Sequence, residues 1–542
     1  MSDIALPGSI EPARSKGPDL DGGMHPLTGI IYLGVVAAAL LFVAYSIYDD
    51  VDATGTRITS FAPYILLFVA LLIALGFEFV NGFHDTANAV ATVIYTRSLP
   101  ANVAVVWSGM FNLFGVLMST GAVAFGVVSL LPVELILQVG SGAGFAMVFA
   151  LLISAIMWNV GTWYFGLPAS SSHTLIGSIM GVGIANALLR GRDGTSGVDW
   201  SQAGNIGKAL LLSPLFGFAL AAVLLFVLKT VMQKATPALF AEPKGDAAPP
   251  LWIRGILILT CTLVSFFHGS NDGQKGMGLI MLILIGAAPT AYALNRTMPD
   301  SAMPAFIVAA QSAGQVFAAH DGGQAVPTAD VARKTVGDAL RDKKLNQPQV
   351  FGALSVLSND IAANVKNYGS ISHVPAAVTP NLRNDMYLTG DAIRLLPKQG
   401  AKFNATETTK LKTYSDGLLK GTRFIPLWVK VCVAIALGLG TMVGWKRIVV
   451  TVGERIGKTH LTYAQGASAE LVAAATIFGA EYIGVPVSTT HILSSGVAGT
   501  MAANGSGLQW STVRSIALAW VITLPAAMAL AGGLYFVLRL FI

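Results

Sequence analysis

Charge and cysteine are both scarce in this chain of 542 residues. Charged residues make up 11% of it and hydrophobic residues 54%, whereas a soluble domain is typically about 25% charged. This composition and a mean hydropathy of +0.65 exclude an ordinary soluble protein and predict a polytopic membrane protein. The two cysteines, Cys261 and Cys432, lie in apolar runs without metal-type spacing, so they are typical of small core residues and define no redox compartment.

Signatures of other function classes are missing as well. The sequence has no phosphate-loop motif and no His-Glu-x-x-His metal motif, which disfavours a membrane enzyme such as a phosphatase. No cofactor is predicted. The net charge of +6 does not indicate a nucleic-acid partner, because the Lys and Arg residues of a membrane protein gather in cytoplasmic loops and at lipid headgroups.

The apolar runs predict an all-α polytopic membrane protein with about ten to twelve crossings. The runs long enough to span a bilayer are 27–47, 61–80, 101–121, 143–165, 209–232, 251–267, 276–295, 425–443, 461–480 and 512–541. Weaker segments are Gly-rich or short, and we expect half-helices or re-entrant pieces there, whose backbone must be satisfied by protein or water. These segments are 82–96, 122–137, 170–189, 303–319 and 488–503.

The chain divides into two membrane halves joined by a basic linker, and an insertion interrupts the second half. The short linker carries Lys234 and Lys244, so the positive-inside rule predicts that it is cytoplasmic. The insertion is rich in charge and is expected to be hydrophilic and partly helical. The predicted divisions are a mobile tail at 1–26, the first half at 27–232, the linker at 233–250, the start of the second half at 251–295, the insertion at 296–424 and the rest of the second half at 425–542.

Two nine-residue stretches, 81–89 and 268–276, each carry an Asp where an apolar run ends. An ionisable group at membrane depth is costly, so it indicates a site on a transport path; the alternative is a buried Asp that only caps a broken helix. On a helix, three polar residues of each stretch share one face. They are Asn81, Asp85 and Asn88 in the first stretch, and His268, Asp272 and Lys275 in the second.

A second pair of matched stretches is centred on a proline and a run of hydroxyl residues. Residues 166–174 read GLPASSSHT and residues 484–492 read GVPVSTTHI. The proline follows the Asp of its own half by 83 residues in the first half and by 214 in the second, and the excess is close to the length of the insertion. The sequence is therefore an internal repeat, and paired interrupted segments are typical of the midplane site of an inverted-repeat transporter.

Each hydroxyl stretch predicts an anion site at the start of a helix. Proline suits the first helical turn, where backbone N–H groups have no intrahelical partner and the helix dipole is positive. Two such starts could surround a tetrahedral oxyanion with neutral donors. The alternative is that Ser170 and Ser488 are ordinary N-caps and that the other hydroxyls line helix contacts. The candidate anion contacts are Ser170, Ser171, Ser172, Ser488, Thr489 and Thr490.

Further titratable residues accompany these motifs. His173 and His491 end the two hydroxyl runs, where each could be a packing residue, could orient a hydroxyl or could carry a proton. Lys275 needs a partner at membrane depth, and Asp272 is the nearest by helical spacing. Three acids are candidates for a relay or for structural pairing, and the sequence does not choose between these roles: Glu78, Glu470 and Glu481.

In these motifs the chain resembles the inorganic phosphate transporter (PiT) family, and the resemblance covers both halves. It implies an inverted-repeat membrane fold, a homodimer, and phosphate held between the halves. It also implies anion contacts at residues 170–172 and 488–490. The positions that it assigns to the coupling ion or the phosphate network are Asp85, Asn88, Asn271 and Asp272.

Two residues depart from the pattern Gly-Ala-Asn-Asp-Val-Ala-Asn-Ala that is common in the family. His84 replaces the Asn before the first Asp, and Lys275 stands where the late Asn of the second copy would be. An Asn carbonyl can ligate sodium, whereas a lysine ammonium occupies that space and repels the ion. Both departures are similar to the bacterial proton-coupled, low-affinity branch, which carries phosphate with a divalent metal as a neutral complex.

The sequence therefore predicts a secondary active transporter of the plasma (bacterial inner) membrane. It would import inorganic phosphate, with a divalent metal such as magnesium as co-substrate, by proton symport and alternating access. A sodium-coupled phosphate symporter and a sulfate permease of the same fold remain alternatives, while a cation exchanger would not explain the hydroxyl-bearing helix starts. The residues proposed for coupling are His84, Asp85, His173, Asp272, Lys275 and His491, and none is assigned as a fixed metal ligand.

Overall fold

The structure is a computed structural model that describes residues 18, 20, 26–54, 62–131, 142–243, 245, 247–324, 326 and 328–541. Most of the predicted tail at 1–26 and Lys244 of the linker lie outside the described residues. The side chains of Pro26, Ala62, Pro63, Thr86, Ala87 and Asn88 lie outside the description as well. The described chain is helical throughout, with a single isolated β-bridge between Gly457 and Leu508.

The membrane bundle confirms the all-α, multi-pass architecture. Its helices are α1 (Pro26–Asp52), α2 (Ala62–Tyr95), α3 (Ala101–Met118), α4 (Ala122–Val128), α6 (Gly142–Tyr164), α7 (Ser171–Leu189), α8 (Trp200–Met232), α9 (Leu251–Ala287), α10 (Pro289–Tyr292), α16 (Leu427–Thr441), α17 (Lys446–Glu454), α18 (Tyr463–Ile483), α19 (Thr489–Asn504) and α20 (Trp510–Leu538). Eight described helices are long and apolar enough to cross a membrane, or up to nine if α16 is counted with α15 (Ala405–Thr422), from which it bends by 70°. The total of ten to twelve crossings stays a prediction.

The two acidic stretches lie inside continuous helices, which corrects the expectation that the apolar runs end there. The stretch 81–89 belongs to α2, and the stretch 268–276 lies in the middle of α9, a helix of 37 residues. The predicted pairs of segments 61–80 with 82–96, and 251–267 with most of 276–295, are therefore each one helix. A helix can continue through polar residues at this depth because its own backbone bonds stay satisfied and the side chains find partners in the bundle.

Helices of one half pack against helices of the other half. The helix that follows α2, α3, packs on α9, and the helix α16 of the second half packs on α2. In the same way α8 packs on α19, and α20 packs on α7. Glycines of the acidic stretches allow the close approach: a Cβ on Gly82 would collide with Leu437 O of α16, and one on Gly269 with Asn112 O of α3. This reciprocal packing is what a duplicated chain is expected to show.

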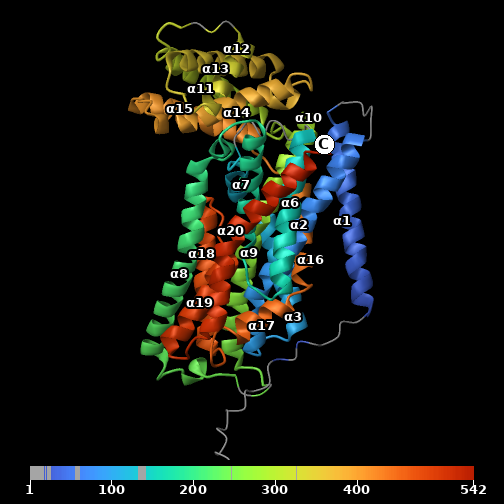
Figure 1. Cartoon of the computed structure of the whole chain (residues 1–542), viewed down its shortest axis with the longest axis vertical. Helices are drawn as coiled ribbons and strands as arrows, with labels where there is room; N and C mark the ends of the chain where they lie inside the picture. Colours follow the sequence, from blue (N-terminus) through green and yellow to red (C-terminus); the bar gives the residue numbers. More distant parts are fainter. Residues whose placement is uncertain are drawn as a thin grey trace, which may run out of the picture.

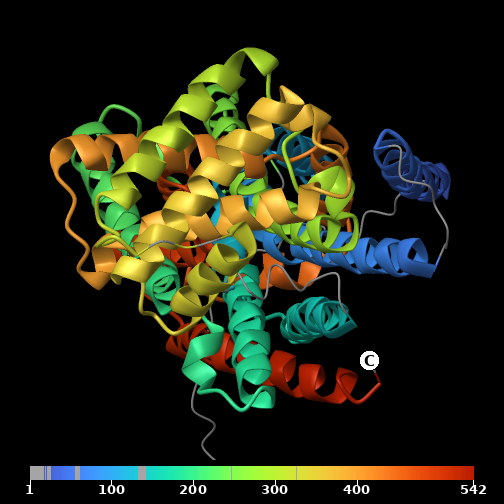
Figure 2. The same cartoon turned by 90° about the horizontal axis from the view of Figure 1, so that it is seen from above.

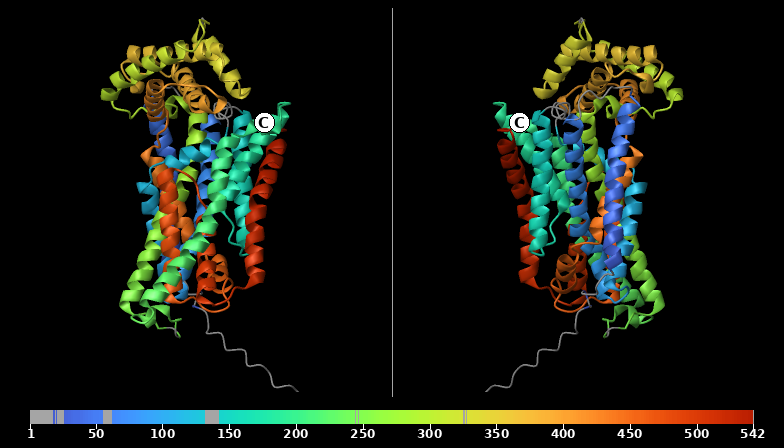
Figure 3. Two further views of the ribbon diagram at one scale, coloured as in Figure 1. Left: turned by 90° about the vertical axis from the view of Figure 1, so that its left-hand side faces the viewer. Right: turned by 90° about the vertical axis from the view of Figure 1, so that its right-hand side faces the viewer.

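The insertion forms a separate helical layer at one end of the bundle (Figure 1, Figure 3). Its helices are α11 (Met303–Ala318), α12 (Ala329–Arg341), α13 (Pro348–Tyr368), α14 (Thr379–Leu395) and α15. They pack around an apolar core of their own, and seen from above they cover much of the bundle (Figure 2). The segment 303–319, which was expected to be a half-helix or re-entrant piece, is α11, and it packs on α13 and α15 of the insertion.

The insertion and the basic linker lie at opposite ends of the bundle (Figure 1). Helix α8 begins beside the insertion, where Lys398 Nζ donates to Ser201 Oγ at 2.7 Å, and its other end leads into the linker. If the linker is cytoplasmic, as its charge predicts, the insertion faces the other side of the membrane. The positive-inside rule applied to this one short loop therefore decides the orientation of both features.

Both cysteines are buried thiols. Cys261 is 0% exposed in α9 and Cys432 is 2% exposed in α16, and neither forms a disulfide. They pack among apolar side chains of the bundle, as the sequence predicts for small core residues.

Candidate functional site

The two hydroxyl stretches form the starts of α7 and α19. Ser170 Oγ accepts a hydrogen bond from His173 N at 3.1 Å, and Ser488 Oγ accepts one from His491 N at 3.2 Å. Both serines are thus N-caps, which satisfies one backbone donor of each helix and leaves the others at the helix start without an intrahelical partner. The first hydroxyl of each run caps its helix, so the second and third hydroxyls are the candidates for a site.

These two helix starts meet inside the bundle. Helix α7 runs from this point toward the insertion and α19 runs away from it (Figure 1). Ser172 Oγ of α7 donates to Val487 O, which precedes α19, at 2.7 Å. The positive ends of two helix dipoles therefore face one buried region from opposite directions, and such a region favours an anion.

Asp85 of α2 joins both hydroxyl runs. Its Oδ2 accepts from Ser171 Oγ at 2.6 Å, and its Oδ1 accepts from Thr490 Oγ1 at 2.5 Å. His84 Nδ1 lies 3.2 Å from the same Oδ1, and the other ring nitrogen of His84 lies 3.2 Å from Thr162 Oγ1. The carboxyl group is 2% exposed, so its charge is compensated by neutral hydroxyls of both halves and by one histidine.

Asp272 of α9 has the Lys275 ammonium and a histidine as partners instead. Lys275 Nζ lies 2.7 Å from its Oδ1, and His268 Nε2 lies 3.5 Å from its Oδ2. The same Lys275 Nζ donates to Ser172 Oγ at 2.5 Å. Lys275 therefore links Asp272 to Ser172, the third hydroxyl of the α7 run. The third hydroxyl of the α19 run is Thr490, and it bonds directly to Asp85.

The remaining hydroxyl and amide candidates divide between donors and supports. Thr489 Oγ1 is buried and has no hydrogen-bond partner among the described residues, so it is available to a ligand. Asn271 supports the approach to α19: its Nδ2 lies 3.4 Å from Val485 O, and its Oδ1 lies 3.5 Å from Val487 N. The side chain of Asn88 lies outside the description, and its predicted role stays a prediction.

The two histidines that end the hydroxyl runs face each other. The ring centroids of His173 and His491 lie 4.6 Å apart, and the His491 ring stacks on Trp520 at 4.1 Å. Trp520 Nε1 donates to Pro168 O at 2.9 Å, which ties α20 to the chain that leads into α7. His173 Nδ1 and His491 Nε2 are buried without hydrogen-bond partners among the described residues. The ring contacts show that the two histidines pack against each other, and their predicted role in coupling stays a prediction.

A possible cation site lies between the two acidic stretches. One ligand atom each of Asp85, His268 and Asp272 lies within 4.8 Å of the others, and all three side chains are buried. Two carboxylates and an imidazole suit a divalent cation, and the Lys275 ammonium lies beside one of these carboxylates, that of Asp272. His268 shares the helix face of Asp272 but was not expected to take part in a site; its i, i+4 spacing from Asp272 is the sequence signal that indicates it.

Two of the three other acids accept hydrogen bonds from hydroxyl groups of neighbouring helices. Glu470 of α18 accepts hydrogen bonds from Thr92 of α2 and from Thr260 of α9, so it links both acidic helices. Glu481 accepts from Ser270 Oγ at 2.5 Å, and Glu78 is fully buried against Gly276. These hydrogen bonds favour structural pairing for Glu470 and Glu481.

Comparison with known proteins extends these observations. A family model described as the phosphate transporter family matches residues 81–531. The low-affinity inorganic phosphate transporter PitA of Escherichia coli K12 is 42% identical and PitB of the same strain 41% identical, each over 87% of this chain and 96% of the relative. A probable low-affinity inorganic phosphate transporter of Bacillus subtilis is 28% identical over 88% of this chain and 99% of its own. A solved sodium-dependent phosphate transporter covers 88% of this chain and 100% of its own at 18% identity, with a TM-score of 0.48.

The family match takes in both acidic stretches, both hydroxyl runs and the insertion. The relatives are named as transporters and not as enzymes, which removes the membrane phosphatase from consideration. Together with the apolar helices of the bundle, these bacterial relatives make the chain an integral, multi-pass protein of the bacterial inner membrane. The chain belongs to the phosphate transporter family.

Proposed function

We propose that the chain imports inorganic phosphate by proton symport with alternating access, and that phosphate binds between the starts of α7 and α19. The observation that carries the proposal is the double contact of Asp85, whose carboxylate takes one hydroxyl from each run. Because this carboxylate is bonded to both halves, a movement of one half relative to the other changes its hydrogen bonds. Phosphate would enter the same buried region, where two positive helix ends converge.

The donors proposed for phosphate lie around this point. The Thr489 hydroxyl has no partner among the described residues, and Lys275 Nζ already donates to the Ser172 hydroxyl. Ser171 and Thr490 would release the Asp85 carboxylate once it is protonated, and their hydroxyls would then serve the ligand. Neutral hydroxyls compensate the lost hydration of an anion without holding it as tightly as fixed cations, which suits repeated release.

The proposed proton carrier is Asp85. Carrying one net charge across 100 mV changes the energy by about 2.3 kcal/mol, so a load that is nearly neutral crosses with least opposition from the membrane potential. Protonation of a carboxyl group that otherwise competes with phosphate for the same hydroxyls makes the binding of the two ligands mutually favourable. His84, 3.2 Å from the carboxylate, is the proposed proton partner.

A divalent cation such as Mg²⁺ is proposed as co-substrate. Asp85, His268 and Asp272 supply two carboxylates and an imidazole for it. A metal-phosphate complex has a lower net charge than phosphate alone, which is the same electrostatic benefit that a proton gives. We also propose that the protein is a homodimer, as the family resemblance implies. The mass of the purified protein–detergent complex tests this.

Sodium coupling is the second candidate, and the geometry favours protons. The Lys275 ammonium, 2.7 Å from the Asp272 carboxylate, repels any cation bound there, sodium and a divalent cation alike, so a proton on Asp85 is the coupling ion that meets the least repulsion. A sulfate permease would use the same hydroxyls, so the anion is decided by measurement.

The deciding experiment is uptake of radiolabelled phosphate into proteoliposomes under an imposed pH gradient, with sodium, magnesium and excess unlabelled sulfate varied one at a time. We expect uptake driven by the inward proton gradient and increased by magnesium, without a need for sodium. Uptake that requires sodium would replace the proton in the proposal. Absence of phosphate uptake together with sulfate uptake would overturn the substrate.

A further inference from the structure

A cavity of about 500 Å³ lies between the insertion and the bundle. Its floor is formed by the loop before α4 and by the first turns of that helix, and its roof by the insertion. On one side it reaches Ile483 and Gly484 at the end of α18. We call this cavity the basic vestibule, because three of the residues that line it are Arg394, Lys420 and Arg423.

The charged side chains that line the basic vestibule are cationic. No acidic side chain is among its described lining residues. Arg394 is paired with Asp391 at 2.8 Å and with Asp199 at 3.0 Å, so its charge is compensated. Lys420 and Arg423 have no ion pair among the described residues, and both are exposed to the cavity side of the insertion. Asp391 acts on Arg423 only at a distance and Lys420 adds a second cation, so the lining keeps an excess of positive charge, which attracts an anion that carries two negative charges.

The position of the basic vestibule relates it to the transport site. Gly484 ends α18 in a left-handed turn (φ +77°), and the chain then runs through Val485 and Val487 to the start of α19. The carbonyls of both valines accept hydrogen bonds at the site, from Asn271 and Ser172 respectively. Only two residues thus lie between Gly484 in the wall of the vestibule and Val487, whose carbonyl accepts from Ser172 at the site. An ion in the vestibule is therefore close to the chain segment that leads into α19.

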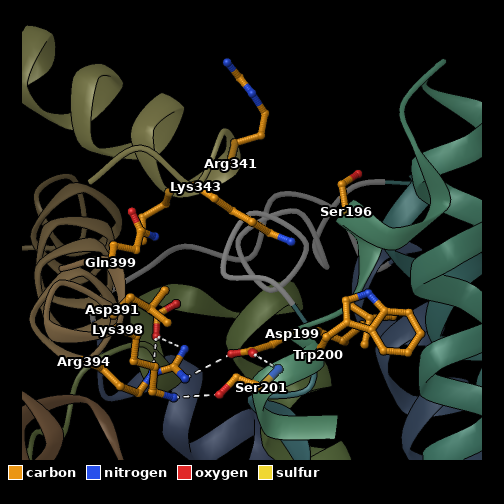
Figure 4. A pocket seen from close by; sticks show the side chains of 14 residues that line it. Ser196, Asp199, Trp200, Ser201, Arg341, Lys343, Asp391, Arg394, Lys398 and Gln399 are labelled. Atoms are coloured by element: carbon orange, nitrogen blue, oxygen red, sulfur yellow. Dashed lines mark hydrogen bonds and ion pairs between the residues drawn. The ribbon is translucent and has the colours of Figure 1, made fainter. Parts of the chain in front are cut away.

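Specific contacts hold the insertion in this place. Arg394 of α14 bonds to Asp199, the N-cap of α8, and Lys398 bonds to Ser201 of the same helix (Figure 4). Arg423 lies over the ring of Phe125 in α4, with 5.5 Å between its guanidinium carbon and the ring centroid. The cations are therefore presented to the bundle by a docked domain. Figure 4 shows the neighbouring cavity that shares Arg394, where Asp199 and Asp391 pair with its guanidinium; Arg341, Lys343 and Lys398 also line this cavity.

We infer that the basic vestibule is a second, outer binding site for inorganic phosphate, which collects the anion beside the entrance of the transport site. This inference rests on the proposed function. It gives the insertion a task, which is to raise the local concentration of a divalent anion at one mouth of the transporter. Lys420 and Arg423 are the residues that bind, and Arg394 positions the domain.

The test uses exchange of radiolabelled phosphate across proteoliposomes with equal phosphate on both sides, because the vestibule then lies on the path whichever side the insertion faces. Removing one cation, by Lys420→Gln or Arg423→Gln, should raise the KM roughly threefold, and removing both roughly tenfold, with Vmax unchanged. The differences should shrink at high ionic strength, since the Debye length falls to about 3 Å at 1 M salt. Arg423→Lys should keep the KM of the wild type.

Lys412→Gln is the matched control, because it removes one exposed cation from the same helix, α15, without touching the vestibule. If the wild type exchanges phosphate and the double variant has an unchanged KM, the inference is wrong while the proposed function stands. If the wild type exchanges no phosphate, the proposed function is wrong, and the inference, which rests on it, is wrong as well. If the variants change the dependence on the fraction of anionic lipid and leave the KM for phosphate alone, the vestibule holds a lipid headgroup, and the inference is overturned.

Discussion

Asp85 and Asp272 occupy corresponding places in two copies of one motif, yet the structure gives them different partners. Neutral hydroxyls from both helix starts bind Asp85, whereas the Lys275 ammonium and an imidazole compensate Asp272. A carboxylate that is held by hydroxyls can exchange them for a proton or a ligand. A carboxylate that is held by a buried ammonium cannot give up its partner without leaving a charge behind. The carboxylate of the first copy therefore has partners that it can exchange, and the carboxylate of the second copy has a cation fixed beside it.

The largest effect is expected from breaking the second copy. Lys275→Met leaves the Asp272 carboxylate without its ammonium, and removal of one partner of a buried ion pair costs about 3–5 kcal/mol of stability. We expect a strongly lowered midpoint of thermal unfolding in detergent and loss of transport. The double variant with Asp272→Asn and Lys275→Met should recover most of the stability, because no buried charge remains. A double variant as unstable as Lys275→Met would show that Asp272 does not depend on this cation.

A smaller loss is expected at the first copy, and it should appear in transport and not in stability. Asp85→Asn cannot ionise and accepts hydrogen bonds through one oxygen only, and a hydrogen bond to a charged group is worth about 1.5–3 kcal/mol, or roughly ten- to a hundredfold. We expect proton-driven accumulation of phosphate to fall by that factor at a nearly unchanged unfolding midpoint. Full proton-driven uptake by Asp85→Asn would rule out this residue as the coupling group.

The smallest effect on transport is expected at a third buried Asp, which lies outside the membrane and serves as a reference. Asp385 of the insertion forms two bonds with Arg333, at 2.6 and 2.9 Å. Burial raises the pKa of Asp385 from 3.8 to about 6, although Arg333 works in the other direction. Because this pKa lies above its ordinary value, the stability contributed by the protonated carboxyl is present below pH 3.8 and is lost as the pH rises through about 6.

Hydrogen exchange of the full chain, corrected for the intrinsic rate, measures this difference in α14. Protection should decrease as the pH rises through the pKa of Asp385, and the decrease should disappear in Asp385→Asn. Phosphate uptake by this variant should stay close to that of the wild type. A pH profile that is the same in both proteins would show that Asp385 does not titrate in this range.

Much of the architecture follows from hydropathy and spacing, because both depend on local sequence. The apolar runs predicted the helices, and the matched stretches at Asp85 and Ser171 predicted that distant motifs would meet. The run lengths misplaced the ends of α2 and α9, since polar residues such as Asp272 lower the hydropathy of a helix without ending it. Backbone bonding, and not side-chain polarity, decides where a buried helix stops.

The partner choices within the site could not be predicted, because they depend on how the halves pack. Helical spacing put Lys275 next to Asp272, but nothing local indicated that its ammonium would also reach Ser172 of the other half. The bond between Thr490 and Asp85 spans 405 positions of the chain. The close contacts of Gly82 and Gly269 could not be predicted either, because the sequence does not distinguish a glycine needed for backbone conformation from one needed for close packing.

The burial of Cys261 and Cys432 has a practical consequence for labelling experiments. Thiol-reactive probes that act from water should label the two native cysteines only weakly, so the labelling of a cysteine introduced elsewhere can be measured with little background. Ile483, whose side chain is 74% exposed at the edge of the basic vestibule, is a suitable position for one. A membrane-impermeant reagent applied from each side in turn would then show which face of the cell membrane the insertion occupies.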